Sequence, residues 1–177
     1  MRKLTSAAAV AVTIAMSGFF SAPASAQNYW QCVTFARFFS GIQIFGDAWT
    51  WWQSASSKNY RTGTAPEAGA VLVFKKTGVM TRGHVAVVSQ VLTDRIVQIT
   101  HANWSPINGR RGQVEKDVTM IDVSDKGDWS QVKVWYGPIE NLGGKVYPTY
   151  GFIYQEKLPA TTYASAGGGD ANAALAP

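Results

Sequence analysis

Hydrophobic residues change their spacing along this chain, and the change predicts helices first and strands afterwards. Between Cys32 and Ser40, apolar residues recur at the three- and four-residue spacing of one helix face. Asn28 is the expected N-cap, with Gln31 three residues later as its reciprocal partner. Gly41 is expected to end the helix, because glycine adopts the backbone conformation that follows a last helical turn.

A second helix is expected to begin near Asp47, to carry Trp49, Trp51 and Trp52, and to end in the serine-rich segment 54–57. Beyond it, short segments rich in Val and Ile alternate with turn residues, which predicts β-strands. The predicted strands are 70–75, 84–92, 95–102, 117–123, 131–136 and 152–155. This order predicts an α+β domain in which N-terminal helices pack on a single antiparallel sheet of about five to six strands.

The two ends of the chain differ in composition from the middle. Arg2 and Lys3 precede an apolar run, and Ala24-Ser25-Ala26 follows as a small-x-small cleavage site. Residues 1–26 are therefore predicted to be a secretory signal peptide, whose apolar run is too short to span a membrane. Residues 159–177, mostly Ala, Gly, Ser and Thr, are predicted to be a disordered tail. The domain at 27–158 is expected to be exported to the periplasm, the cell wall or the medium, with no membrane attachment after cleavage.

Composition and charge limit the partners of this domain. Only 15% of the residues are charged while 12% are aromatic, which suits an aromatic core with some aromatic side chains left for a cleft. The net charge of +5 is small, scattered and unaccompanied by any nucleic-acid-binding motif, so we expect no nucleic-acid partner. A mild positive charge is compatible with an anionic polymer. Arg110-Arg111 is expected to lie in a solvated turn after Asn108-Gly109.

Cys32 is the only cysteine of the chain. In an oxidising compartment a lone thiol is buried and inert, paired between chains, or retained because it reacts. The position of Cys32 in the first turn of a predicted helix favours the reactive alternative, because the helix dipole lowers the pKa of a thiol there. A neighbouring histidine would lower that pKa further, and the chain offers only His84 and His101.

His84 opens the predicted strand 84–92, at a place suited to hold an imidazole against the thiol as a general base and acid. A half-buried structural histidine is the alternative. His101 and Asn103 share one face at the end of the following strand, and either of them can orient the His84 ring. Zinc binding by Cys32, His84 and His101 is not expected, because close-spaced ligand pairs are missing from the sequence. No cofactor is expected.

These residues occur in motifs that resemble the CHAP domain, a cysteine- and histidine-dependent amidohydrolase or peptidase of the papain-like group. The motifs are Gln31-Cys32 at a helix start, Asp47-Ala48, Pro66-Glu67-Ala68-Gly69, Gly83-His84 before an apolar strand, and Thr100 to Trp104. The similarity runs from about Tyr29 to Tyr136. It implies a papain-like fold with Cys32 as nucleophile and His84 as base. Family members often have Glu where His101 stands, and many have Asp at the position of Ala70.

The resemblance implies an exported enzyme that cleaves amide bonds in peptidoglycan through a Cys32 thioester, with the wall peptide as its partner. For the oxyanion, the expected donors are the backbone N–H of Cys32 and the side chain of Gln31. Trp104 and either Tyr29 or Trp30 are expected to wall the cleft. A transferase using the same two residues, a weakly active or inactive peptidoglycan-binding or regulatory module, and a structural envelope protein are the alternatives. We expect a monomer; whether a regulatory protein controls it is left open.

Overall fold

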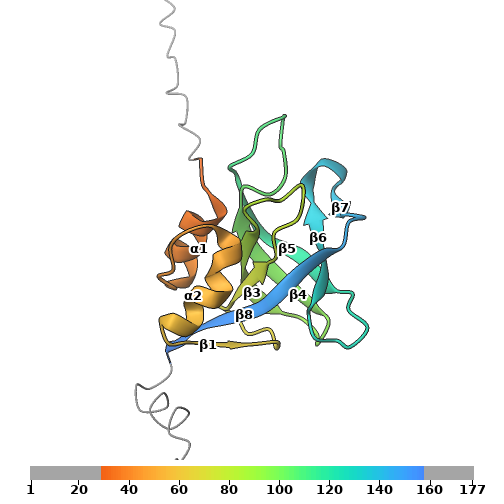
Figure 1. Cartoon of the computed structure of the whole chain (residues 1–177). Helices are drawn as coiled ribbons and strands as arrows, with labels where there is room; N and C mark the ends of the chain where they lie inside the picture. The colour runs from red at the N-terminus through yellow and green to blue at the C-terminus, as the bar shows by residue number, and fades with distance from the viewer. Residues whose placement is uncertain (1–28, 158–177) are drawn as a thin grey trace, which may run out of the picture.

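The computed structural model describes residues 29–157 (Figure 1). The predicted signal peptide at 1–26, the predicted N-cap Asn28 and the predicted tail at 159–177 lie outside the described residues. In chain order the elements are α1 (Cys32–Ser40), η1 (Ala48–Thr50), α2 (Trp51–Ser57), β1 (Tyr60–Gly63), β2 (Val71–Phe74), β3 (His84–Val91), β4 (Ile96–Ala102), β5 (Val114–Asp122), β6 (Gln131–Tyr136), η2 (Gly137–Ile139), β7 (Asn141–Leu142) and β8 (Tyr147–Lys157). Within residues 29–157, no helix is long and apolar enough to cross a membrane.

Helix α1 has the predicted limits but not the predicted cap. It begins at Cys32, and Gly41 ends it in the left-handed conformation (φ 76°), where the Gly41 N–H donates to the carbonyl of Arg37. The N-cap residue is Gln31, in extended conformation, and its side chain makes no capping hydrogen bond. The prediction of Asn28 as N-cap is therefore wrong, and the Gln31 side chain is available for another contact.

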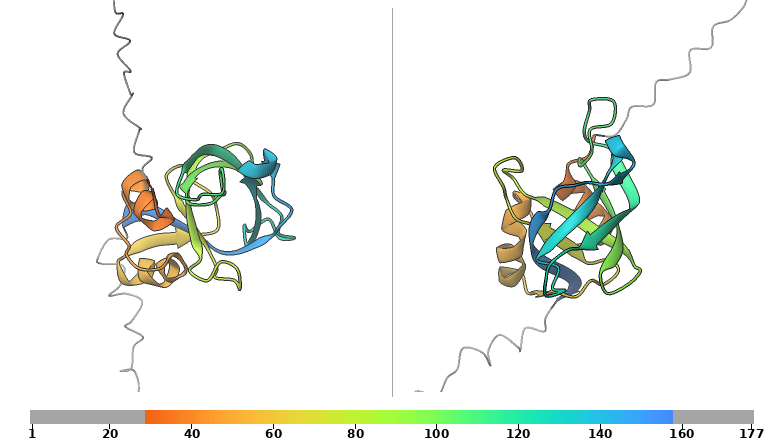
Figure 2. Two further views of the ribbon diagram at one scale, coloured as in Figure 1. Left: turned by 90° about the horizontal axis from the view of Figure 1, so that it is seen from above. Right: turned by 90° about the vertical axis from the view of Figure 1, so that its right-hand side faces the viewer.

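The sheet closes on itself, which corrects the prediction of a single sheet of five to six strands beneath two helices. Its strand order is β1-β8-β2-β3-β4-β5-β6-β7, and an additional pairing between β8 and β6 closes six of these strands into a barrel. Figure 2 shows this ring of strands from above, with the helices outside it on one side. The domain is mostly β.

Closure depends on the length of β8, which extends five residues further toward its N-terminus than the predicted strand 152–155. Its later residues pair with β1 and β2, and its first residues, Tyr147 and Pro148, pair with β6. Gly151 allows the strand to bend between these partners: it has φ 136°, and a Cβ there would lie 2.6 Å from the carbonyl oxygen of Gly63.

Two hydrophobic cores lie on the two faces of β2, all four residues of which are buried. Leu72 and Phe74 belong to the cluster inside the barrel. Val71 and Val73 belong to the outer cluster, where the helical segment contributes the fully buried Trp51. The side of the barrel that carries α1 and α2 is thus buried on both faces, which fixes the position of α1 against β3.

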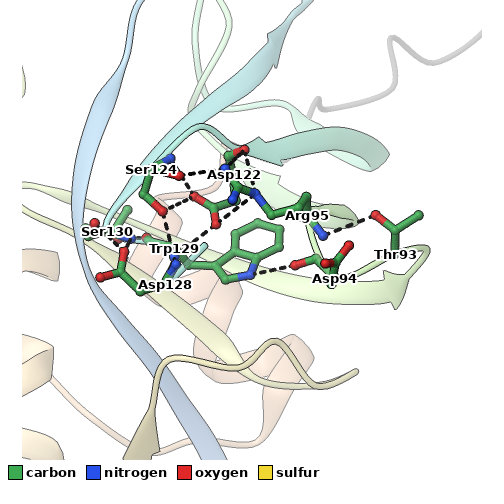
Figure 3. Close-up of polar contacts among 9 residues, drawn as sticks. Thr93, Asp94, Arg95, Asp122, Ser124, Asp128, Trp129 and Ser130 are labelled. Atoms are coloured by element: carbon green, nitrogen blue, oxygen red, sulfur yellow. Dashed lines mark hydrogen bonds and ion pairs between the residues drawn. The ribbon is translucent and has the colours of Figure 1, made fainter. Parts of the chain in front are cut away.

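At the end of β5 farthest from Val114, Asp122 holds the loop to β6 (Figure 3). Its carboxylate, with 0% side-chain exposure, accepts hydrogen bonds from the N–H and the hydroxyl of Ser124 at 2.8 and 2.6 Å and from the N–H of Trp129 at 3.2 Å. The Nε of Arg95 lies 3.3 Å from Asp122 Oδ2. This buried charge therefore has both hydrogen-bond donors and a cation, as a stable buried carboxylate requires.

Candidate active site

A cleft of about 510 Å³ lies between the start of α1, the segment 79–83 that precedes β3, and the ends of β4, β6 and β8. Among the residues predicted for the site, the cleft is lined by Gln31, Cys32, His84, Asn103 and Trp104. His101 lies behind them, with a fully buried side chain. The structure therefore brings a thiol and an imidazole from separate elements to one concave surface.

Cys32 is the first residue of α1, and its half-buried thiol packs partly against the outer core. Burial raises the pKa of this thiol, and the nearby carboxylate of Asp47 raises it further. Backbone N–H groups of Val85, Val33 and Cys32 itself act in the opposite direction but do not outweigh burial. The helix start is where the sequence predicted it, but the expected lowering of the thiol pKa is wrong because the packing of α1 on β3 desolvates the sulfur.

His84 is the first residue of β3 and is 3% exposed. Gly83 precedes it with φ 68°, and a Cβ at Gly83 would lie 2.8 Å from the Trp49 nitrogen and 2.9 Å from the Phe74 carbonyl oxygen. Only glycine fits this turn without displacing backbone, so Gly83 fixes where the strand and its imidazole begin.

The His84 ring is paired with His101 rather than with Asn103. Nε2 of His84 lies 3.0 Å from Nδ1 of His101, within hydrogen-bond distance. The side chain of Asn103 instead donates to Oε1 of Gln31 at 3.1 Å, which joins the end of β4 to the start of α1. Because His101 occupies Nε2 of His84, Nδ1 is the nitrogen that remains for the thiol.

Both imidazoles are held in the neutral form. Burial lowers the pKa of His84 well below its usual value, and the proximity of His101 and Arg111 adds to this. Burial alone lowers the pKa of His101 to about 3. At neutral pH each ring therefore has one N–H donor and one acceptor nitrogen, and the hydrogen bond between them requires opposite roles at its two ends. Within residues 29–157, no group of three His, Cys, Asp or Glu side chains is placed to hold a metal ion.

The aromatic and amide residues predicted for the cleft occupy different places. Trp104 packs against both imidazoles, with ring centroids 4.8 Å from His84 and 5.5 Å from His101. Gln31 lines the cleft, and since its Oε1 accepts from Asn103, its NH₂ group is the part left to donate. Tyr29 does not line the cleft but packs against Gly112.

Several residues that the sequence interpretation did not select also belong to the site. Arg111, expected in a solvated turn, lines the cleft together with Tyr136 and Tyr147. Glu115 lies behind His101, with its Oε1 3.9 Å from His101 Nε2 and 10% side-chain exposure. It was overlooked because the strand was predicted to begin at residue 117, whereas β5 begins at Val114. The β4–β5 register, in which His101 and Glu115 are direct partners, is the signal that identifies it.

The model of the CHAP domain family matches residues 23–103, which confirms the resemblance predicted from the sequence. The matched segment includes Cys32, His84, His101 and Asn103, and it ends before β5, which carries Glu115. The comparison with curated proteins gives no match. Since CHAP domains are generally amidases or peptidases, the match indicates a hydrolase of this type.

Proposed function

We propose that this protein is an exported cysteine amidase or endopeptidase that cleaves amide bonds in peptidoglycan. The observation that carries the proposal is that Cys32 and His84 line one cleft while the far nitrogen of His84 is bonded to His101. A nucleophile, a base and a residue that orients the base are the parts that covalent acyl transfer requires. The CHAP match over the same residues gives independent support.

In the proposed reaction, His84 Nδ1 takes the thiol proton as the Cys32 sulfur attacks the carbonyl carbon of the scissile amide. The backbone N–H of Cys32 and the NH₂ group of Gln31 donate to the oxyanion of the tetrahedral intermediate. The C–N bond then breaks, His84 returns the proton to the departing amine, and a thioester remains on Cys32. Water deprotonated by His84 attacks this thioester, which releases the carboxylic acid and restores the thiol.

The protonation state of Cys32 and His84 before substrate binds helps to distinguish the alternative functions. The raised pKa of the Cys32 thiol and the lowered pKa of His84 both favour a neutral thiol beside a neutral imidazole. The thiol proton therefore has to move to His84 before or during attack on the substrate. The same observation favours one second candidate, a weakly active or inactive peptidoglycan-binding module, because such a module has no need of a thiolate. A transferase with an amine in place of water requires the same residues as the hydrolase.

Arg111 supports an anionic peptide as substrate. Two arginines line the cleft, and Arg82 is paired with Asp47 at 3.2 Å. Within residues 29–157, Arg111 has no ion-pair partner, yet it lies close enough to add to the lowering of the His84 pKa that burial causes. An unpaired guanidinium beside the reacting groups suits a carboxylate near the scissile bond, such as those of peptidoglycan stem peptides.

The test is digestion of purified peptidoglycan by the mature protein and by Cys32→Ser, with the products identified by mass. New fragments from the wild type alone are expected, and their masses name the bond. Fragments extended by an added amine would identify a transferase. No fragments from either protein, together with Cys32 alkylation that is no faster in the wild type than in His84→Gln, would overturn the enzymatic proposal in favour of a binding module. The mass of the protein recovered from an exporting host tests cleavage after Ala26.

A further inference from the structure

We infer that Glu115 is a positioning residue: its carboxylate fixes which nitrogen of His101 carries the proton, and through His101 it fixes the tautomer of His84. This inference rests on the proposed function, since it assigns a role in the same site. Glu115 lies on β5, outside the segment that matches the CHAP family model.

The first support is that the carboxylate is held in place. Glu115 Oε1 accepts a hydrogen bond from the backbone N–H of Ser105 at 2.8 Å, and Oε2 accepts one from the Ser105 hydroxyl at 2.7 Å. The Cα atoms of Glu115 and His101 are direct partners in the antiparallel β4–β5 ladder. A side chain anchored at both oxygens and at its Cα presents its charge to His101 in a fixed direction.

The second support is an unsatisfied atom. His101 Nε2 is buried and has no hydrogen-bond partner within residues 29–157, and the Glu115 Oε1 atom lies 3.9 Å from it. A buried polar nitrogen without a partner is costly, because it has lost its hydrogen bonds to water and gained none in the fold. A small approach of the Glu115 carboxylate provides the missing acceptor. The carboxylate therefore favours a proton on Nε2, where it is attracted to the negative charge.

The consequence for the reacting pair follows from the donor count of neutral imidazole. With its proton on Nε2, His101 has Nδ1 as an acceptor, so His84 must donate from Nε2 across the 3.0 Å contact. The lone pair of His84 is then on Nδ1, the nitrogen left for the thiol. The opposite tautomer of His101 would donate from Nδ1, force the His84 proton onto Nδ1 and leave no base for Cys32.

Glu115→Gln tests the role of the charge. Because the Ser105 N–H donates to Oε1, the amide oxygen keeps that place and the NH₂ group takes the place of Oε2. The variant therefore removes the negative charge beside His101 Nε2 and weakens the preference for a proton there. We expect kcat for fragment release to fall about 10- to 100-fold, the range found when the hydrogen-bond partner of a metal-bound histidine is removed. Asp117→Asn is the matched control, because Asp117 lies two residues along β5 and contacts Thr100 instead. It is expected to leave kcat unchanged.

A measurement without substrate separates this inference from the proposed function. Nitrogen NMR of the imidazole rings reports which ring nitrogen is protonated, and it applies to the wild-type protein as it stands. We expect both His84 and His101 to be protonated on Nε2 in the wild type, and the Nδ1–H form of His101 to increase in Glu115→Gln. An Nδ1–H tautomer of His101 in the wild type, or no change in the variant, would overturn the inference even if peptidoglycan is cleaved.

The variant Glu115→Asp separates charge from shape, since it keeps the carboxylate and shortens the side chain by one methylene. It is expected to keep the wild-type tautomers and to recover most of the lost kcat; the behaviour of Glu115→Gln would contradict the charge-based role. In the pH profile of Cys32 alkylation, Asp47 acts on the thiol, Arg111 and His101 act on His84, and Glu115 lies beside His101, while Tyr147 lines the same cleft. Glu115→Gln is expected to slow alkylation across the profile, and Asp117→Asn is not. An unchanged alkylation profile in Glu115→Gln would count against the inference.

Discussion

The two carboxylates of β5, Glu115 near its start and Asp122 at its end, are held in the same way but have different partners. Each accepts hydrogen bonds from both the backbone N–H and the hydroxyl of one serine, Ser105 for Glu115 and Ser124 for Asp122. Asp122 also has the guanidinium of Arg95 at 3.3 Å, a permanent cation. Glu115 has His101 at 3.9 Å, which is neutral because burial lowers its pKa to about 3.

The difference separates a structural site from a reactive one. Around Asp122 the carboxylate faces the permanent cation of Arg95 and three hydrogen-bond donors, and the result is a fixed connection between β5 and β6. Around Glu115 the neighbouring His101 is neutral, and in the proposed reaction a positive charge appears there only when the thiol proton reaches the two histidines. An incompletely satisfied buried group is costly to keep, so its presence beside a cleft points to function.

Removal of the base is expected to give the largest effect on the reactive side. His84→Gln should lower kcat/KM by about 10⁴-fold, because general base and general acid are lost together. Its free energy of unfolding should fall little, since a buried neutral histidine is replaced by a side chain that still offers a donor and an acceptor. Fragment release and urea unfolding on the same sample check both expectations. A large loss of stability would show that His84 also supports the fold.

The corresponding change on the structural side should affect stability alone. Asp122→Ala is expected to lower the free energy of unfolding by about 3–5 kcal/mol, because it leaves three hydrogen-bond donors of Ser124 and Trp129 without their acceptor. Activity per folded molecule should equal that of the wild type. Urea unfolding gives the first quantity, and an assay normalised to folded protein gives the second. Loss of activity in fully folded Asp122→Ala would show that the two ends of β5 are coupled.

Acid should destabilise the folded domain through the buried histidines of the candidate site. The pKa of His101 is about 3 in the folded protein and about 6.5 when unfolded, so below about pH 6.5 the unfolded chain binds the extra proton and stability falls as the pH falls. Each histidine that is neutral in the fold and protonated when unfolded lowers the free energy of unfolding by about 1.4 kcal/mol for each pH unit of acidification in this range. His101→Gln should reduce the slope by about one proton. Unfolding free energies measured between about pH 6.5 and 4.5 test this, and an unchanged slope would mean that His101 is already charged in the fold.

The two serines give the smallest and best-matched comparison. Ser105→Ala and Ser124→Ala each remove one hydroxyl hydrogen bond to a carboxylate, so each should cost about 1 kcal/mol of stability. Only Ser105→Ala is expected to reduce kcat, by a few-fold, because it frees the carboxylate that positions His101. Equal kcat values for the two variants would argue that Glu115 needs no fixed position.

Local patterns predicted the local parts of this structure. The limits of α1 and the existence of β2, β3, β4 and β6 follow from apolar spacing and turn residues, which act over a few residues. Barrel closure could not be predicted in this way, because Pro148 and Gly151 interrupt the apolar pattern of β8 just where it bends toward β6.

The residues of the candidate site also differ in whether a local sequence pattern predicts them. Cys32 and His84 could be selected because each stands at a recognisable start, of a helix and of a strand. Glu115 could not, since it lies in a polar stretch and faces His101 only through a ladder whose register shifts between Ile99 and His101. The raised pKa of Cys32 also depends on tertiary burial, which no local pattern encodes.

The final strand has a kinetic consequence. Because β8 supplies the pairings to β1, β2 and β6, the barrel cannot close until β8 is available. Val71, for example, pairs with Ile153, 82 residues later in the chain. Contacts between residues so far apart in the chain make folding slow. A chain that emerges from its N-terminus therefore keeps an open sheet edge until β8 has been synthesised, and the barrel interior is protected from water only after β8 pairs.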